Sequence, residues 1–140
     1  MLNAIRDFGQ SGAILLLGLA VGAAWIAAIV APNTSYDDLS EEDADSHVRG
    51  LLKASSDPIA VLLLVAAGLA ILGGALVAGV TALLAAFGFF TNRWTLSDGS
   101  TSKKSTNTKP GKAQRILAVS LTLVFTLVAA TSAGLAVFGY

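Results

Sequence analysis

The sequence contains no cysteine, a single histidine and a single methionine. Without a thiol, the chain can form no disulfide, no thiolate-metal bond and no cysteine nucleophile. Haem iron usually takes histidine, methionine or cysteine as a ligand, but His47 lies in a polar segment and Met1 is the first residue. These absences argue against a redox centre or metalloenzyme built from this chain. We therefore expect no cofactor and no metal site.

Charged residues are also scarce. They make up 13% of the chain, against about 25% in a typical soluble domain. A disordered chain would combine low hydrophobicity with a high net charge. This chain has a mean hydropathy of +0.72 and a formal net charge of zero. The composition therefore indicates an integral membrane protein.

Three stretches without any charged residue or histidine, 12–31, 59–90 and 116–140, carry most of the apolar residues. A spanning helix needs about 20 predominantly apolar residues, and only helices and closed barrels satisfy the backbone inside a bilayer. We expect an all-α integral membrane protein with a single membrane domain over 1–140. Its spans are predicted at approximately 10–31, 58–91 and 115–139.

The first stretch has an alternative interpretation as a secretory signal peptide. Arg6 precedes the apolar residues, and Ala28 and Ala31 resemble a small-residue cleavage site. However, the apolar segment is longer than the usual 7 to 15 residues of such a peptide. Pro32 would also follow the cut directly, which favours a spanning helix.

The second stretch has about 32 residues, which would form a helical rod of about 48 Å. That is longer than one crossing and short for two crossings with a turn, although Gly73 and Gly74 lie at its middle. A hairpin there would place the two flanking polar segments on one side of the membrane. One crossing would place them on opposite sides.

Charge favours the single crossing. The segment 32–57 carries seven acidic residues against Arg49 and Lys53, whereas 91–115 carries six basic residues against Asp98. Cytoplasmic loops are enriched in lysine and arginine. We therefore predict three transmembrane helices with the N-terminus in and the C-terminus out, an external acidic loop over 32–57 and a cytoplasmic basic loop rich in Ser, Thr and Lys over 92–114. The expected location is the cell (inner) membrane of a bacterium.

The acidic segment contains its own helix signal. Ser40, followed by Asp43, resembles a capping box, and apolar residues then recur at helical spacing. We predict a short external amphipathic helix from about Glu41 to Ala54 on the membrane surface. Pro32 and Asn33 are predicted to end the first span. Asp57 with Pro58 is predicted to begin the second.

The basic loop offers a weak contact to anionic lipid, because each lysine or arginine near such a surface contributes about 1 kcal/mol. We expect no nucleic-acid binding, since aromatic stacking partners are absent from the loop. The lysines concerned are Lys103, Lys104, Lys109 and Lys112.

The spans lack groups for catalysis. Ionisable residues inside a membrane mark proton relays, ion paths and ligand counter-ions, and these spans contain none. A serine nucleophile at Ser120 or Ser132 would have no base at its depth. We therefore expect no catalytic residues and no enzyme activity.

Small residues recur along the spans, often four positions apart, and such rows let helix backbones approach closely. They are the candidate helix-packing residues, within the chain or against the other membrane-protein subunits that we expect as partners. These residues are Gly18, Gly22, Ala70, Gly74, Ala78, Ala82, Thr122, Thr126, Ala130 and Gly134.

The sequence leaves three candidate functions for this chain. The leading hypothesis is a non-catalytic accessory or assembly subunit of a larger membrane complex, because small-residue helices combine with an absence of reactive groups. The first alternative is a homo-oligomeric channel or small transporter whose path is lined by threonine hydroxyls. Its candidate residues are Thr81, Thr122, Thr126 and Thr131. The second alternative is a lesion-forming small membrane protein.

Overall fold

The computed structural model describes residues 1–98 and 110–140, with side chains for 1–94 and 116–140. Within the described residues, four segments are long and apolar enough to cross a membrane. The elements in chain order are α1 (Leu2–Trp25), a π-helix η1 (Ile26–Val30), α2 (Ala31–Asp38), α3 (Glu41–Leu72), α4 (Leu76–Asp98) and α5 (Pro110–Val137). The prediction of a helical protein with several span-like helices is confirmed.

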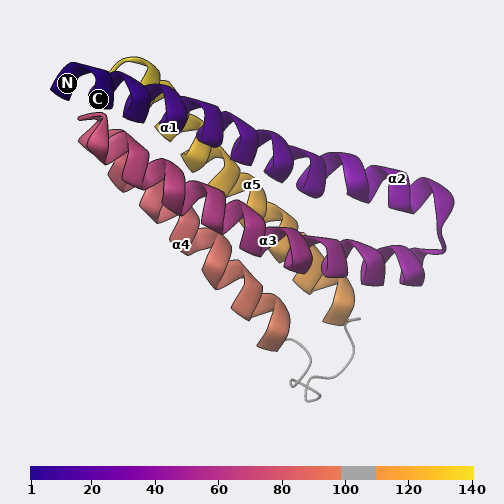
Figure 1. Cartoon of the computed structure of the whole chain (residues 1–140). Helices are drawn as coiled ribbons and strands as arrows, with labels where there is room; N and C mark the ends of the chain where they lie inside the picture. The colour runs from indigo at the N-terminus through magenta and orange to yellow at the C-terminus, as the bar shows by residue number, and fades with distance from the viewer. Residues whose placement is uncertain (99–109) are drawn as a thin grey trace.

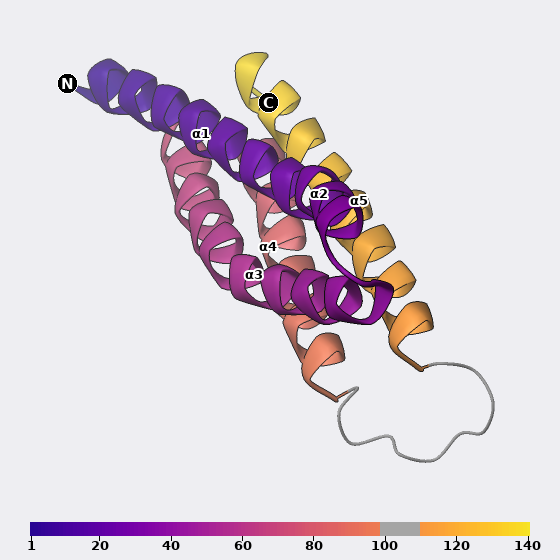
Figure 2. The ribbon, with the colours of Figure 1, turned by 90° about the vertical axis from the view of Figure 1, so that its right-hand side faces the viewer.

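The long helices form an antiparallel four-helix bundle. Helix α1, continued by η1 and α2, packs against α3 and α5, and α4 packs against the same two helices. Both termini lie at one end, together with the turn between α3 and α4 (Figure 1). The α2–α3 loop and the facing ends of α4 and α5 lie at the opposite end, as the turned view also shows (Figure 2). We call these the terminal end and the loop end.

The centre of the bundle is built mainly from alanine. Leu17, Leu63 and Phe89 are the large apolar side chains that lie fully inside it. Most of the other large apolar residues face outward, as a lipid-facing surface requires. Small inward residues let the helix backbones approach closely, which strengthens packing where no hydrophobic effect acts between helices. The buried alanines include Ala13, Ala20, Ala66, Ala70, Ala78, Ala82 and Ala85.

The turn at Gly73–Ala75 replaces the single long helix predicted over 58–91. Gly74 has a φ of +86°, a conformation that favours glycine, and Gly73 ends α3. Gly73 also lies so close to α1 that an added Cβ would be 2.7 Å from the backbone nitrogen of Gln10. The three-span prediction therefore miscounts the helices, because the glycine pair makes a hairpin turn rather than a bend inside one helix.

The first helix does not end at Pro32, contrary to the prediction. Proline lacks an N–H group and its ring crowds the carbonyl four residues earlier, so an unmodified α-helix would be disrupted there. The chain instead adopts a π-helix immediately before it, over Ile26–Val30. Pro32 then occupies the first turn of α2, where no intrahelical N–H is needed.

Helix α3 begins where the capping signal places it but extends beyond the predicted end. The Ser40 side chain accepts a hydrogen bond from the Asp43 backbone N–H at 3.4 Å. From Glu41 the helix continues through Pro58 to Leu72. The predicted Glu41–Ala54 helix is thus the first half of α3, and Asp57 is an interior residue rather than an N-cap. This half packs on η1, α2 and the start of α5, with Val48 and Leu52 buried.

Candidate functional site

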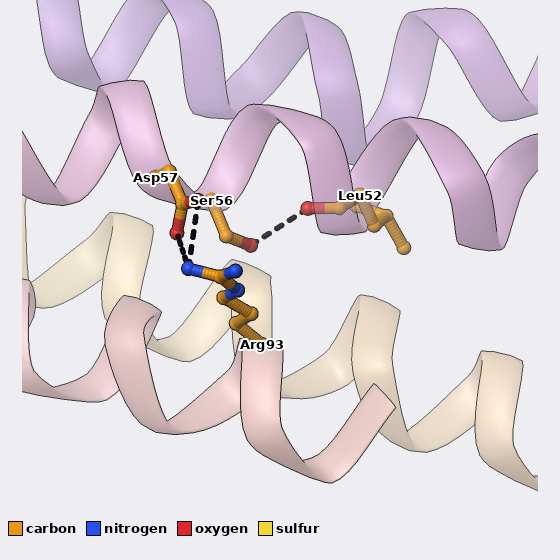
Figure 3. Close-up of polar contacts among 4 residues, drawn as sticks. All are labelled: Leu52, Ser56, Asp57 and Arg93. Atoms are coloured by element: carbon orange, nitrogen blue, oxygen red, sulfur yellow. Dashed lines mark hydrogen bonds and ion pairs between the residues drawn. The ribbon is translucent and has the colours of Figure 1, made fainter. Parts of the chain in front are cut away.

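An ion pair links α3 and α4 near the loop end. The Arg93 Nη1 atom lies 2.9 Å from Asp57 Oδ2 and donates a hydrogen bond to Asp57 Oδ1 at 3.1 Å. Both side chains are about half exposed. Beside them, Ser56 donates its hydroxyl hydrogen to the Leu52 carbonyl at 2.6 Å (Figure 3).

This ion pair does not fit the predicted placement of the two polar segments on opposite sides of a membrane. Asp57 belongs to the segment predicted outside, and Arg93 to the segment predicted in the cytoplasm. Two atoms 2.9 Å apart cannot lie on opposite sides of about 30 Å of hydrocarbon. Four span-like helices in the described residues would place both termini on one side if each crosses the membrane, so the predicted N-in, C-out arrangement is not confirmed.

Buried polar side chains lie near the ion pair. Ser56, Asn92, Thr122 and Thr126 are each at most 4% exposed. The Asn92 Nδ2 group donates to Thr122 Oγ1 at 3.0 Å and so connects α4 to α5. The Asn92 Oδ1 atom is buried without a hydrogen-bond partner. Sequence reasoning missed Asn92, although a polar amide two residues before Trp94 is a readable signal.

The four threonines proposed to line a path do not share one surface. Thr122 and Thr126 are buried, whereas Thr131 is exposed and Thr81 is partly exposed. Each hydroxyl donates to the carbonyl four residues earlier in its own helix, at 2.6 to 2.9 Å. Threonine commonly bonds in this way inside helices, and the donor is then used within the helix. Within one chain, Thr122 and Thr126 are packed inside the bundle.

The predicted helix-packing residues fall into two groups. One group faces the interior of the bundle, where alanines and threonines from α3, α4 and α5 lie together, and Gly74 forms the turn. The interior members are Ala70, Ala78, Ala82, Thr122 and Thr126. The closest approaches of the backbones, however, occur at glycines outside the predicted set, such as Gly9 against Gly73.

The other group faces outward: Gly18 and Gly22 on α1, and Ala130 and Gly134 on α5. A Cβ added at either α1 glycine or at Gly134 would meet no atom within 4 Å. These positions therefore do not hold the bundle together. Gly18 and Gly22 are four residues apart, so they lie on one side of α1 and form a shallow strip.

The loop end also carries a charged arm formed by α2 and the first half of α3. The Tyr36 hydroxyl donates to Asp45 Oδ1, which ties α2 to α3. Asp37, Asp38 and Glu41 are exposed on this arm. Within the described residues, no three His, Asp or Glu side chains are grouped closely enough to hold a metal ion. Lys103, Lys104 and Lys109 lie outside the described residues, as does the side chain of Lys112.

The described side chains support packing, hydrogen bonding and a surface ion pair. Comparison of the chain with models of protein families, with curated proteins and with solved structures found no match.

Proposed function

We propose that this chain is a non-catalytic accessory or assembly subunit of a larger membrane complex, and that it binds its partner through the outer side of α1. The observation that carries the proposal is the strip at Gly18 and Gly22, which has open space over both glycines. Paired small residues four positions apart allow close packing of another transmembrane helix. The bundle itself uses other residues, so the strip is available to a partner.

The side chains around Gly18 and Gly22 are large, apolar and exposed, so they are suited to contact a second transmembrane helix. Leu15 and Leu19 are 72% and 57% exposed, and Trp25 is 53% exposed. These large side chains flank the glycines and can contact a helix that lies in the strip. Lipid and a second copy of the chain are the other possible occupants.

We further propose that the loop end faces the cytoplasm and that both termini face the outside. Arg49 and Lys53 lie on the first half of α3 and Arg93 lies on α4 toward the loop end, and five more lysine and arginine residues follow in the sequence before residue 116. Arg6 lies at the terminal end. The lysine and arginine bias of short cytoplasmic loops then determines the orientation. The acidic arm would therefore be presented to cytoplasmic components, and the bacterial inner membrane stays the expected location.

Site-specific photo-crosslinking in the native membrane tests the α1 proposal. A photo-reactive residue at Leu19 should form a discrete cross-link to one membrane protein, whereas the same probe at Leu64, an exposed residue of α3, should not. The double change G18I and G22I should abolish the Leu19 cross-link. G68I is the matched control, because Gly68 is also exposed with open space around it.

Three results would contradict the proposal. They are a Leu19 probe that reacts only with lipid, a Leu19 cross-link only between two copies of this chain, and a partner cross-link that survives the glycine replacements.

A further inference from the structure

A groove of about 310 Å³ lies between α4 and α5 near the loop end. Leu84, Phe87, Leu121 and Phe125 form its apolar wall, and Thr91 and Asn92 form its polar part. The groove is bounded by Gly88, where the Phe125 ring fills the space that a side chain would occupy. It is too small for a transmembrane helix, whose diameter with side chains is about 10–12 Å.

Asn92 lines this groove and has a buried hydrogen-bond acceptor without a partner. The side chain is 1% exposed, and its Nδ2 group is bonded to Thr122 Oγ1. The Thr122 hydroxyl gives its own hydrogen to the Ala118 carbonyl at 2.7 Å, so it is not available for Asn92 Oδ1. Among the described side chains, Asn92 Oδ1 is the buried polar atom without a partner. Such an atom is costly to leave unbonded, so a donor that reaches it would bind favourably.

The order of groups along the groove follows the order of groups in a lipid. Asn92 is followed by the charged Arg93 and the aromatic Trp94, residue types that are typical of a membrane interface. Leu84 lies deeper by about 12 Å of helix rise. The polar part of the groove is therefore at head-group level, and the apolar wall extends into the hydrocarbon.

We propose that this groove binds a phospholipid whose head group carries an N–H or O–H donor. Its acyl chain lies against the apolar wall, and its head group donates a hydrogen bond to Asn92 Oδ1. Because Oδ1 is itself buried, the amide turns about its terminal torsion to meet the donor, and rotation about this torsion is soft in asparagine. This lipid contact is separate from the outer side of α1 and does not depend on the proposed partner.

Two lipids with the same net charge distinguish hydrogen bonding from charge. Phosphatidylethanolamine has an ammonium donor, whereas phosphatidylcholine has no N–H or O–H group in its head. The full chain is reconstituted in phosphatidylcholine bilayers, and trace spin-labelled forms of each lipid with identical acyl chains are compared. We expect the ethanolamine lipid to associate about threefold more strongly, the ratio for one hydrogen bond of typical strength inside a membrane protein.

Three variants test the assignment of this preference to the groove. Asn92→Leu should abolish the preference, and Leu121→Trp should abolish it by filling the groove. Ser132→Ala is the control, because this buried serine bonds to the Ala78 carbonyl elsewhere in the bundle and its loss should leave the preference intact.

Equal association of the two lipids with the wild-type protein would overturn the proposal. So would a preference that survives Asn92→Leu. If Asn92→Leu does not fold, a preference retained in Leu121→Trp overturns the proposal on its own. Tighter association of phosphatidylglycerol that persists in both variants would assign lipid binding to surface charge instead.

Discussion

Replacing Gly9 with alanine tests the contact that holds α1 against the α3–α4 hairpin. A Cβ on Gly9 would lie 2.8 Å from both the Gly73 nitrogen and the Leu69 carbonyl oxygen. Non-bonded contacts to carbon are optimal at about 3.5–4.0 Å, so reaching this range would require the two backbones to separate by about 0.7–1.2 Å. Backbone atoms in packed helices cannot move away as a flexible side chain can.

Gly68→Ala is the matched control. Gly68 is an exposed glycine of α3 with no atom within 4 Å of an added Cβ. Alanine favours the helix by about 1 kcal/mol over glycine at either position, so the difference between the two variants isolates the clash. Overpacking of this kind typically costs about 1–3 kcal/mol. We expect Gly9→Ala to be less stable than Gly68→Ala by that amount.

The assay is unfolding in mixed micelles with a rising fraction of sodium dodecyl sulphate, followed by circular dichroism. If the two variants unfold within about 0.5 kcal/mol of each other, the range of ordinary surface substitutions, then α1 does not pack on the hairpin turn as described.

Three further predictions can be tested in the same titration. Ser132→Ala removes the 2.7 Å hydrogen bond to the Ala78 carbonyl and should destabilise the protein by about 0.6–1.7 kcal/mol, so an unchanged midpoint would refute that link between α5 and α4. Gly74→Ala places a side chain at a φ of +86° and should cost about 1–2 kcal/mol; no loss would argue against the turn. Asp57→Asn and Arg93→Gln should each destabilise the protein by less than about 1 kcal/mol, because the ion pair is half exposed. The double variant should lose less stability than the sum of the two single losses. Strict additivity would mean that the ion pair contributes nothing to stability.

The helical membrane character of the chain could be predicted from the sequence because it depends on composition and on the length of apolar stretches. The start of α3 could also be predicted, since the Ser40 cap is a local interaction between residues three apart. In both cases the determining physics lies within one segment. No knowledge of the other helices was needed.

The hairpin could not be assigned in this way. Gly73 and Gly74 lie at the middle of the apolar stretch 59–90, but this stretch alone is short for two membrane crossings and a turn. The structure extends both helices with polar residues whose charges neutralise each other, Asp57 on α3 and Arg93 on α4. That pairing is a tertiary contact between residues 36 positions apart, and the charge bias between loops gave the opposite answer.

The sequence identifies the small residues of each helix but not which side of the helix each one occupies. Ala70, Ala78 and Ala82 are buried, whereas Gly18, Gly22 and Gly134 face outward. Small residues occupy several sides of each helix, so a row with a spacing of four does not identify the inner side. On α5 the buried side passes from Thr126 to Ala129 and so changes spacing.

The arrangement of the four helices is tested most directly by the sidedness of three single cysteines. They are introduced into this cysteine-free chain at Asn3, Ser46 and Ser97. Ser46 is exposed on the first half of α3, Ser97 lies in the last turn of α4, and Asn3 lies at the terminal end. A membrane-impermeant thiol reagent applied to intact cells should label position 3. Positions 46 and 97 should both stay protected until the membrane is opened. Labelling of position 46 with protection of position 97 would put the two positions on opposite sides of the membrane and contradict the four-helix hairpin arrangement.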